Sequence, residues 1–304
     1  SQGERCLRGV SLASGETLRS DHVILALGHC ARVTFAMLQA RGVYLEPKPF
    51  SIGFRIEHPQ SLIDQARFGQ QAGHAILGAA DYHLVHHGQD GRSVYSFCMC
   101  PGGTVVAATS EAGRVVTNGM SQYSRNERNA NAALVCDITP ADYAAHGAGP
   151  LAGIALQQHW ETHAFELGGG DYNAPAQRVE DFLAGRATTA LGDVSPSYQP
   201  GVRLTDLSTA LPDYAIAAIR TAIPIFARRI RGYAIPDAML TGVETRTSSP
   251  IRIRRRIEDL QSLNTRRLWP AGEGAGYAGG ILSAAADGIR VAEAVVSQVQ
   301  KGRR

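Results

Sequence analysis

Residues 267–288 read RLWPAGEGAGYAGGILSAAADG, and this stretch decides the fold prediction. It predicts a short buried strand, a glycine-rich turn that carries the acidic residue Glu273, and a helix whose first turn is built from small residues. The first turn of a helix leaves backbone N–H groups unpaired and carries the positive end of the helix dipole. Such a turn suits a pyrophosphate or an electron-rich ring oxygen, so the candidate ligand is a nucleotide cofactor.

An amphipathic helix of about 20 residues is predicted from Gly280 onward, because apolar side chains recur there at helical spacing. The apolar positions are Leu282, Ala285, Ala286, Ile289, Ala292, Val296 and Val299. Gly274, Gly276 and Gly279 also match the GxGxxG pattern of a dinucleotide-binding turn. That pattern must open a βαβ unit with an acidic residue about 20 positions further on, and here only the helix follows. We therefore interpret the turn as the closing element of a cofactor site.

Composition and length favour a globular protein of two lobes. The 304 residues are 44% hydrophobic and 19% charged, the proportions of a soluble domain. No apolar run approaches the roughly 20 residues of a membrane span, and no signal peptide opens the sequence, so we expect a cytoplasmic protein with no membrane partner. Five cysteines, an odd number, argue against a disulfide framework and for a reducing compartment.

The first 45 residues predict a small sheet and one helix. A Ser-Gly pair between residues 6–12 and 17–19 indicates a hairpin. The continuous apolar run 23–27 is typical of a strand buried on both faces, and Gly28 ends it. Residues 31–41 predict a short helix that Gly42 closes.

After Pro47-Lys48-Pro49 the sequence changes character, which marks a candidate domain boundary. Strands are predicted at 82–86, 94–100, 104–109, 115–117, 238–246 and 251–253, and helices at 60–69, 151–167 and 176–183. Residues 207–230 predict two further helical segments, the last interrupted by Pro224. Residues 129–135 are alanine-rich and fit either a helix or a strand.

Residues 9–28 resemble the hairpin and strand that precede the second glycine motif in flavoproteins of the glutathione-reductase-like superfamily. Residues 269–288 resemble their closing flavin-binding motif, in which an acidic residue contacts the ribitol and the helix points at the flavin. The likeness is strongest to the uncharacterised FAD-dependent dehydrogenases of bacteria, where stretches similar to 97–103, 117–121 and 242–250 are expected. The resemblance implies FAD as the cofactor and covers nearly the whole sequence.

These flavoproteins begin with a βαβ unit whose GxGxxG turn holds the ADP half of FAD, and no such turn lies upstream of Gly28. The resemblance therefore implies the carboxy-terminal portion of a longer enzyme, whose amino-terminal nucleotide-binding unit is its expected partner. The fold class expected is α/β, a partial Rossmann-like FAD-binding lobe with an inserted α+β substrate lobe. The expected lobes are 1–47 and 246–304 for FAD and 48–245 for the substrate.

Candidate site residues follow from these motifs. Residues expected to bind the cofactor are Gly28, Gly102, Gly103, Gly272, Glu273, Gly279, Gly280 and Ile281. The carboxylate of Glu273 can accept hydrogen bonds from sugar hydroxyls. The Gly102-Gly103 pair permits close approach of the backbone to a ring, or forms a plain hairpin turn.

Glu244 and Arg246 are the candidate catalytic residues. On a strand they share a face and either bind a polar substrate or the flavin together, or form a structural salt bridge. Ser248, Ser249 and Tyr277 are the candidate substrate-binding residues, Tyr277 lining the ring side.

Cys98 and Cys100 lie two apart on a predicted strand and so point to one side, which suits redox exchange or plain burial. The three histidines His83, His86 and His87 lack the paired spacing of a zinc site, and no metal is expected.

The function expected is hydride transfer between FAD and an unidentified small-molecule substrate. One alternative is a non-catalytic scaffold with an incomplete cofactor site. The other is an RNA-modifying flavoprotein, which only the arginine-rich stretch 252–256 supports, and nucleic acid is otherwise not an expected partner.

Overall fold

Strand β6 lies in the middle of an eight-stranded sheet in the computed structural model, which describes residues 5–302. The strands run in the order β12-β11-β13-β6-β10-β8-β7, and β9 pairs with β8. The strands are β6 (Phe50–Pro59), β7 (Val85–His87), β8 (Ser93–Ala107), β9 (Thr117–Ser121), β10 (Asn129–Ile138), β11 (Ala174–Arg178), β12 (Val202–Leu204) and β13 (Met239–Glu244). Of the pairings with a defined register, only β11 with β12 is parallel, so the sheet is mostly antiparallel.

The alternation of side chains along β6 gives the sheet one apolar and one polar buried face. Ile52, Phe54 and Ile56 are fully buried on one side, where Phe54 meets Phe182 edge to face at 5.9 Å between ring centroids. The intervening Arg55 is also fully buried, on the opposite side. The polar face of this sheet is therefore inside the protein and must satisfy its charges internally.

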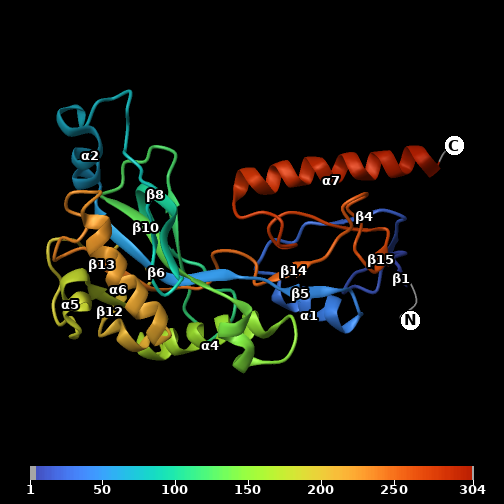
Figure 1. Ribbon diagram of the computed structural model, residues 1–304, viewed down its shortest axis with the longest axis horizontal. Helices are drawn as coiled ribbons and strands as arrows, with labels where there is room; N and C mark the ends of the chain where they lie inside the picture. Colours follow the sequence, from blue (N-terminus) through green and yellow to red (C-terminus); the bar gives the residue numbers. More distant parts are fainter. Residues whose placement is uncertain (1–4, 303–304) are drawn as a thin grey trace. The chain divides into compact units, whose positions relative to one another are not determined.

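Helices cover this sheet in the second of two units, formed by Ser51–Ile138 and Gln157–Thr247. α2 (Gln60–Phe68), α5 (Val179–Ala184), α6 (Asp213–Ala227) and the short helices η1 (Gly69–Gln71) and η3 (Leu207–Thr209) belong to it. α6 packs against β7, β8 and β10, and Figure 1 labels α6, β8 and β10. The predicted interruption at Pro224 is wrong, because α6 continues past it to Ala227.

Two further predictions in this unit are wrong. The two strands expected at 94–100 and 104–109 are one continuous strand, β8, because Gly103 between them is paired to both β9 and β10. The helix expected at 176–183 begins only at Val179, because residues 174–178 pair with β12 and β13 as strand β11. Sheet pairing overrides the local helical pattern at this place. Residues 129–135, which fitted either state, are strand β10.

The first unit contains the residues up to Phe50, Thr139–Leu156 and the residues from Ser248 onward. Residues 139–156 thus group with this unit and not with the lobe expected at 48–245. Its strands are β1 (Arg5–Cys6), β2 (Gly9–Ser11), β3 (Thr17–Arg19), β4 (Val23–Leu25), β5 (Leu45–Pro47), β14 (Ile251–Ile253), β15 (Thr265–Arg266) and β16 (Leu268–Pro270). Its helices are α1 (Arg32–Ala40), α3 (Pro140–Tyr143), η2 (Ala144–His146) and α7 (Ile281–Gly302). The helix α4 (Ala152–Leu167) belongs to this unit only up to Leu156.

These strands form four two-stranded sheets: β1 with β15, β2 with β3, β4 with β16, and β5 with β14. The hairpin of β2 and β3 confirms the turn predicted at Ser14-Gly15. The prediction that 23–27 is buried on both faces is wrong, since Ile24 is 46% exposed and, within residues 5–302, β4 pairs with β16 alone. As a whole the described chain is a mixed α/β structure, and no helix in it is long and apolar enough to cross a membrane.

α7 carries apolar side chains on two faces. Val291 is fully buried in a cluster with Trp269 and Ala271. Leu282, Ile289 and Val296 are 86%, 63% and 54% exposed. Their spacing of seven residues places them in one stripe along the other side of the helix. We call this stripe the open face of α7.

His58 makes the stability of the folded protein depend on pH. It is fully buried, its Nε2 lies 2.6 Å from the carbonyl oxygen of Tyr233, and burial lowers its pKa to about 4, against 6.5 for a free histidine. Because the folded pKa is the lower one, the unfolded chain is protonated first as the pH falls. Stability is therefore lost between about pH 6.5 and pH 4, by about 3 kcal/mol in all.

Urea unfolding at pH 7 and pH 4 measures this loss. We expect His58→Gln to have a smaller drop in the free energy of unfolding than the wild type, by about 3 kcal/mol. His83→Gln, at an exposed histidine, is the control and keeps the wild-type drop. Equal pH dependence in all three proteins would contradict the assignment.

Candidate functional site

The turns after β4 and β16 meet in the first unit. The two strands pair in parallel, with Val23 opposite Leu268, so both end at the same edge. A Cβ at Gly274 would overlap the backbone of Gly28. Glycine at position 274 is therefore what lets the two turns touch.

Glu273 and His29 face each other at these turns. His29 Nδ1 lies 3.5 Å from Glu273 Oε1, and the two side chains are 20% and 23% exposed. Burial acts to lower the pKa of His29, but hydrogen bonds with Cys30 and Glu273 outweigh it and raise the pKa to about 10. The imidazole is therefore positively charged at neutral pH and still reachable from solvent.

Lys48 and Arg252 add positive charge beside Glu273. Burial and the Arg252 guanidinium lower the pKa of Lys48, and Glu273 acts in the opposite direction. The Lys48 amine donates to the carbonyl oxygen of Pro49 at 3.1 Å and to Ser248 Oγ at 3.4 Å. Glu273 thus stands beside two basic side chains, His29 and Lys48, an arrangement suited to an anionic ligand.

A buried ion pair anchors the turn that carries Glu273. Asp287 of α7 accepts two hydrogen bonds from Arg255, at 2.9 and 2.5 Å, and a third from the backbone N–H of Gly272 at 2.8 Å. Burial acts to raise the pKa of Asp287, but these three hydrogen bonds lower it below its usual value. The glycine turn is therefore fixed to the helix that follows it.

The N-terminal turn of α7 is open. Ile281 is 90% exposed, and a Cβ at Gly279 or Gly280 would have no atom within 4 Å. Ser283 donates to the carbonyl oxygen of Gly280 at 2.9 Å and accepts from the N–H of Gly279 at 3.2 Å. Space for a ligand therefore exists at the helix start, which carries the positive end of the dipole.

The three predicted substrate-binding residues all support local structure. Tyr277 stacks on Arg255 at 3.8 Å, and its hydroxyl accepts a hydrogen bond from the N–H of that residue. Ser249 is buried and donates to the carbonyl oxygen of Gly274 at 3.2 Å, and Ser248 accepts from Lys48.

The two predicted catalytic residues lie in the second unit, each in its own ion pair. Glu244 pairs with Arg55 at 3.1 Å and Arg246 with Glu161 at 2.8 Å. The alternative in which Glu244 and Arg246 pair with each other is wrong, because β13 ends at Glu244 and the strand alternation ends with it. Burial raises the pKa of Glu244 to about 7, against the effect of Arg55.

Gly102 and Gly103 lie inside β8, so the alternative of a plain hairpin turn is wrong. The N–H of Gly102 donates to Gln60 Oε1 at 2.6 Å, and a Cβ there would overlap the backbone of Arg125. The close approach expected of these glycines is made to the protein's own backbone.

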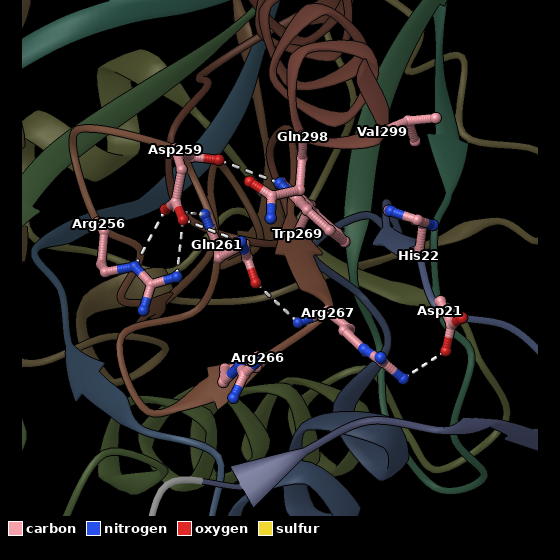
Figure 2. Close-up of a pocket in the computed structure, with 10 residues that line it drawn as sticks. All are labelled: Asp21, His22, Arg256, Asp259, Gln261, Arg266, Arg267, Trp269, Gln298 and Val299. Atoms are coloured by element: carbon pink, nitrogen blue, oxygen red, sulfur yellow. Dashed lines mark hydrogen bonds and ion pairs between the residues drawn. The ribbon is translucent and has the colours of Figure 1, made fainter. Parts of the chain in front are cut away.

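A cavity of about 490 Å³ lies in the first unit beside β16 and the C-terminal half of α7 (Figure 2). His22 stacks on Trp269 at its wall, with ring centroids 5.5 Å apart, and Arg267 pairs with Asp21. None of the predicted site residues lines this cavity. It is therefore separate from the glycine turn at the other end of α7.

The four arginines of the stretch 252–256 are all paired with carboxylates, three in number. Arg252 and Arg254 pair with Glu46, Arg255 with Asp287, and Arg256 with Asp259. RNA binding relies on positive charge that phosphates can neutralise, so this stretch gives the RNA alternative little support. Among residues 5–302, no three His, Cys, Asp or Glu side chains come together as a metal site.

Residues 49–247 match the family model described as FAD-dependent protein, C-terminal domain-like. The chain belongs to this family of FAD-dependent proteins. An uncharacterized protein of Clostridium beijerinckii is 49% identical over 288 residues, which cover 94% of this chain and 54% of that protein. The chain thus spans about half the length of the curated relative it matches.

In this member of the FAD-dependent protein family, the sequence did not lead us to four residues that pair with the predicted site residues or lie beside them. They are His29, Lys48, Arg55 and Glu161. A usable signal existed for two of them, since His29 directly follows Gly28 in the turn after β4 and Lys48 stands between two prolines. Arg55 and Glu161 are recognisable only from partners that are distant in the sequence.

Proposed function

We propose that this chain is part of an FAD-dependent oxidoreductase that transfers a hydride between the flavin and a small-molecule substrate. The observation that carries the proposal is the junction of the turns after β4 and β16, where Glu273 and His29 meet. Membership in a family of FAD-dependent proteins supports the choice of cofactor.

The residues of the first unit fit a flavin nucleotide. In the proposal Glu273 accepts hydrogen bonds from ribityl hydroxyls, and His29 holds the carboxylate in place. The backbone at Gly28 and Gly274 and the open start of α7 provide the close approach that a nucleotide needs. Lys48 supplies a basic group for its anionic groups.

A bound flavin accepts or donates the hydride, and the protein positions it and tunes its surroundings. In this proposal Glu244 and Arg246 are positioning residues, because both are buried and occupied by ion pairs. Among the predicted site residues, Glu273 is the one that we propose to hydrogen-bond to the cofactor itself.

The proposed partner is an amino-terminal nucleotide-binding unit of the same protein. The open face of α7 supports this, because three large apolar side chains in one stripe are exposed there. The curated relative, of which the matched residues cover 54%, is long enough to contain such a unit. We propose that the unit packs on Leu282, Ile289 and Val296 and completes the cofactor site.

FAD titration tests both parts of the proposal. We expect tight, saturable quenching of flavin fluorescence when this chain is co-expressed with the amino-terminal half of the Clostridium beijerinckii relative, and weaker binding by the chain alone. Glu273→Gln removes a charged acceptor and should weaken binding roughly tenfold or more. Glu16→Gln, at an exposed carboxylate in the turn between β2 and β3, is the matched control.

Ile289→Lys places a charge on the open face and should abolish co-purification of the amino-terminal half. Absence of saturable binding in both preparations would contradict the oxidoreductase proposal. It would favour the non-catalytic scaffold.

A further inference from the structure

Cys98 and Cys100 are brought together by a bulge in β8. Phe97 pairs with Ala133 and Cys100 with Asn131, so three steps along β8 match two steps along β10. Cys98 has a φ of 43°, the left-handed region that a non-glycine residue adopts rarely. The Cys100 thiol donates a hydrogen bond to the backbone carbonyl oxygen of Cys98 at 3.3 Å.

The two thiols differ in their access to solvent. Cys98 is exposed and Cys100 is 6% exposed. A soluble reagent can reach the first sulfur and not the second. This is the arrangement of an attacking thiol with a sheltered resolving thiol behind it.

Arg55 provides a fixed positive charge at the sheltered sulfur. Its Nη2 lies 3.5 Å from Cys100 Sγ and donates to the carbonyl oxygen of Cys98 at 2.9 Å. Asn131 and Glu244 hold the guanidinium in place. A Cβ at Gly119 would overlap this guanidinium, so the strand beside it leaves room for it.

The hydrogen bond to Cys98 and burial raise the pKa of Cys100, and Arg55 lowers it. Cys100 is therefore protonated at rest. The structure thus favours a fixed order, with Cys98 reacting first and Cys100 second.

We propose that Cys98 and Cys100 form a reversible dithiol/disulfide site that exchanges with low-molecular-weight disulfides. The Cys98 thiolate attacks a disulfide RS–SR, the S–S bond of the reagent breaks, and RS⁻ leaves. The Cys100 thiol gives its proton to the departed thiolate and attacks the Cys98 sulfur, and the second RS⁻ leaves and is protonated by water. Two protein thiols are oxidised by two electrons and one RS–SR is reduced to two RSH.

Oxidised glutathione is the probe, used on the whole chain. Trypsin releases residues 93–114 with Cys98 and Cys100 as the only cysteines. We expect this peptide to become lighter by two hydrogen atoms and to carry no glutathione, and dithiothreitol to reverse the change. Cys6 and Cys30, both exposed, react in the same sample and report that the reagent is active.

Two conservative variants separate the steps. Cys100→Ser should keep one glutathione on Cys98, because resolution is blocked. Cys98→Ser should leave Cys100 unmodified, because that sulfur is buried. The proposal is overturned if the wild-type peptide keeps one glutathione, as the Cys100→Ser peptide is expected to do. It is also overturned if the wild-type peptide stays reduced while Cys6 and Cys30 react. The readout is a mass and does not depend on flavin binding.

Discussion

Replacing Glu161 by alanine is expected to lower the free energy of unfolding by about 3–5 kcal/mol. Glu161 is fully buried on α4 and accepts hydrogen bonds from Arg246 Nε at 3.0 Å, Arg246 Nη2 at 2.8 Å and Thr245 Oγ1 at 2.8 Å. The substitution leaves a guanidinium that is 4% exposed without its carboxylate. Ser110, which accepts one hydrogen bond from Arg246, cannot supply the missing charge.

Urea unfolding monitored by circular dichroism measures the effect. Glu166→Ala, on the same helix at a side chain that is 69% exposed, should change stability by less than about 1 kcal/mol. The double variant Glu161→Met with Arg246→Met should recover most of the loss, since an apolar pair leaves no buried charge unpaired. A Glu161→Ala protein as stable as Glu166→Ala would contradict the assignment.

Replacing Asp287 by alanine is expected to cost the first unit about 3–5 kcal/mol and to abolish FAD binding. Its carboxylate is the shared partner of the Arg255 side chain and the Gly272 N–H, so one substitution frees a buried guanidinium and a backbone donor. The turn that presents Glu273 then loses its attachment to α7. Binding should be lost although Asp287 itself needs no contact with the cofactor.

Thermal unfolding and FAD titration of the co-expressed complex test this prediction together. Asp287→Asn keeps an acceptor for the Gly272 N–H and should be intermediate in both measurements. Glu16→Ala, at an exposed carboxylate of the same unit, is the control. Full FAD affinity in Asp287→Ala would show that the turn does not need this anchor.

The parts of the fold that the sequence predicts well are those set by local patterns. α7, α1 and the β2–β3 hairpin follow from helical periodicity, a closing glycine and a Ser-Gly turn. β6 was missed, although Phe50, Ile52, Phe54 and Ile56 alternate through it. Its polar positions conceal the strand, because a buried arginine on a central strand is rare in the absence of a partner.

The side-chain clusters were harder to predict than the elements. Arg55 and Glu244 are 189 positions apart, and their pairing depends on the order of strands in the sheet. Glu244 and Arg246 share a face only while a strand continues, and β13 ends between them. By contrast, Glu273 was placed correctly between a strand and a glycine turn, because that placement requires only its neighbours in the sequence.

The division into units has a genetic consequence. The chain passes between the units at residues 50/51, 138/139, 156/157 and 247/248, and two of these points lie inside β6 and α4. Neither unit is encoded by one uninterrupted stretch of DNA. Recombination at any single point can therefore neither remove a unit nor transplant one.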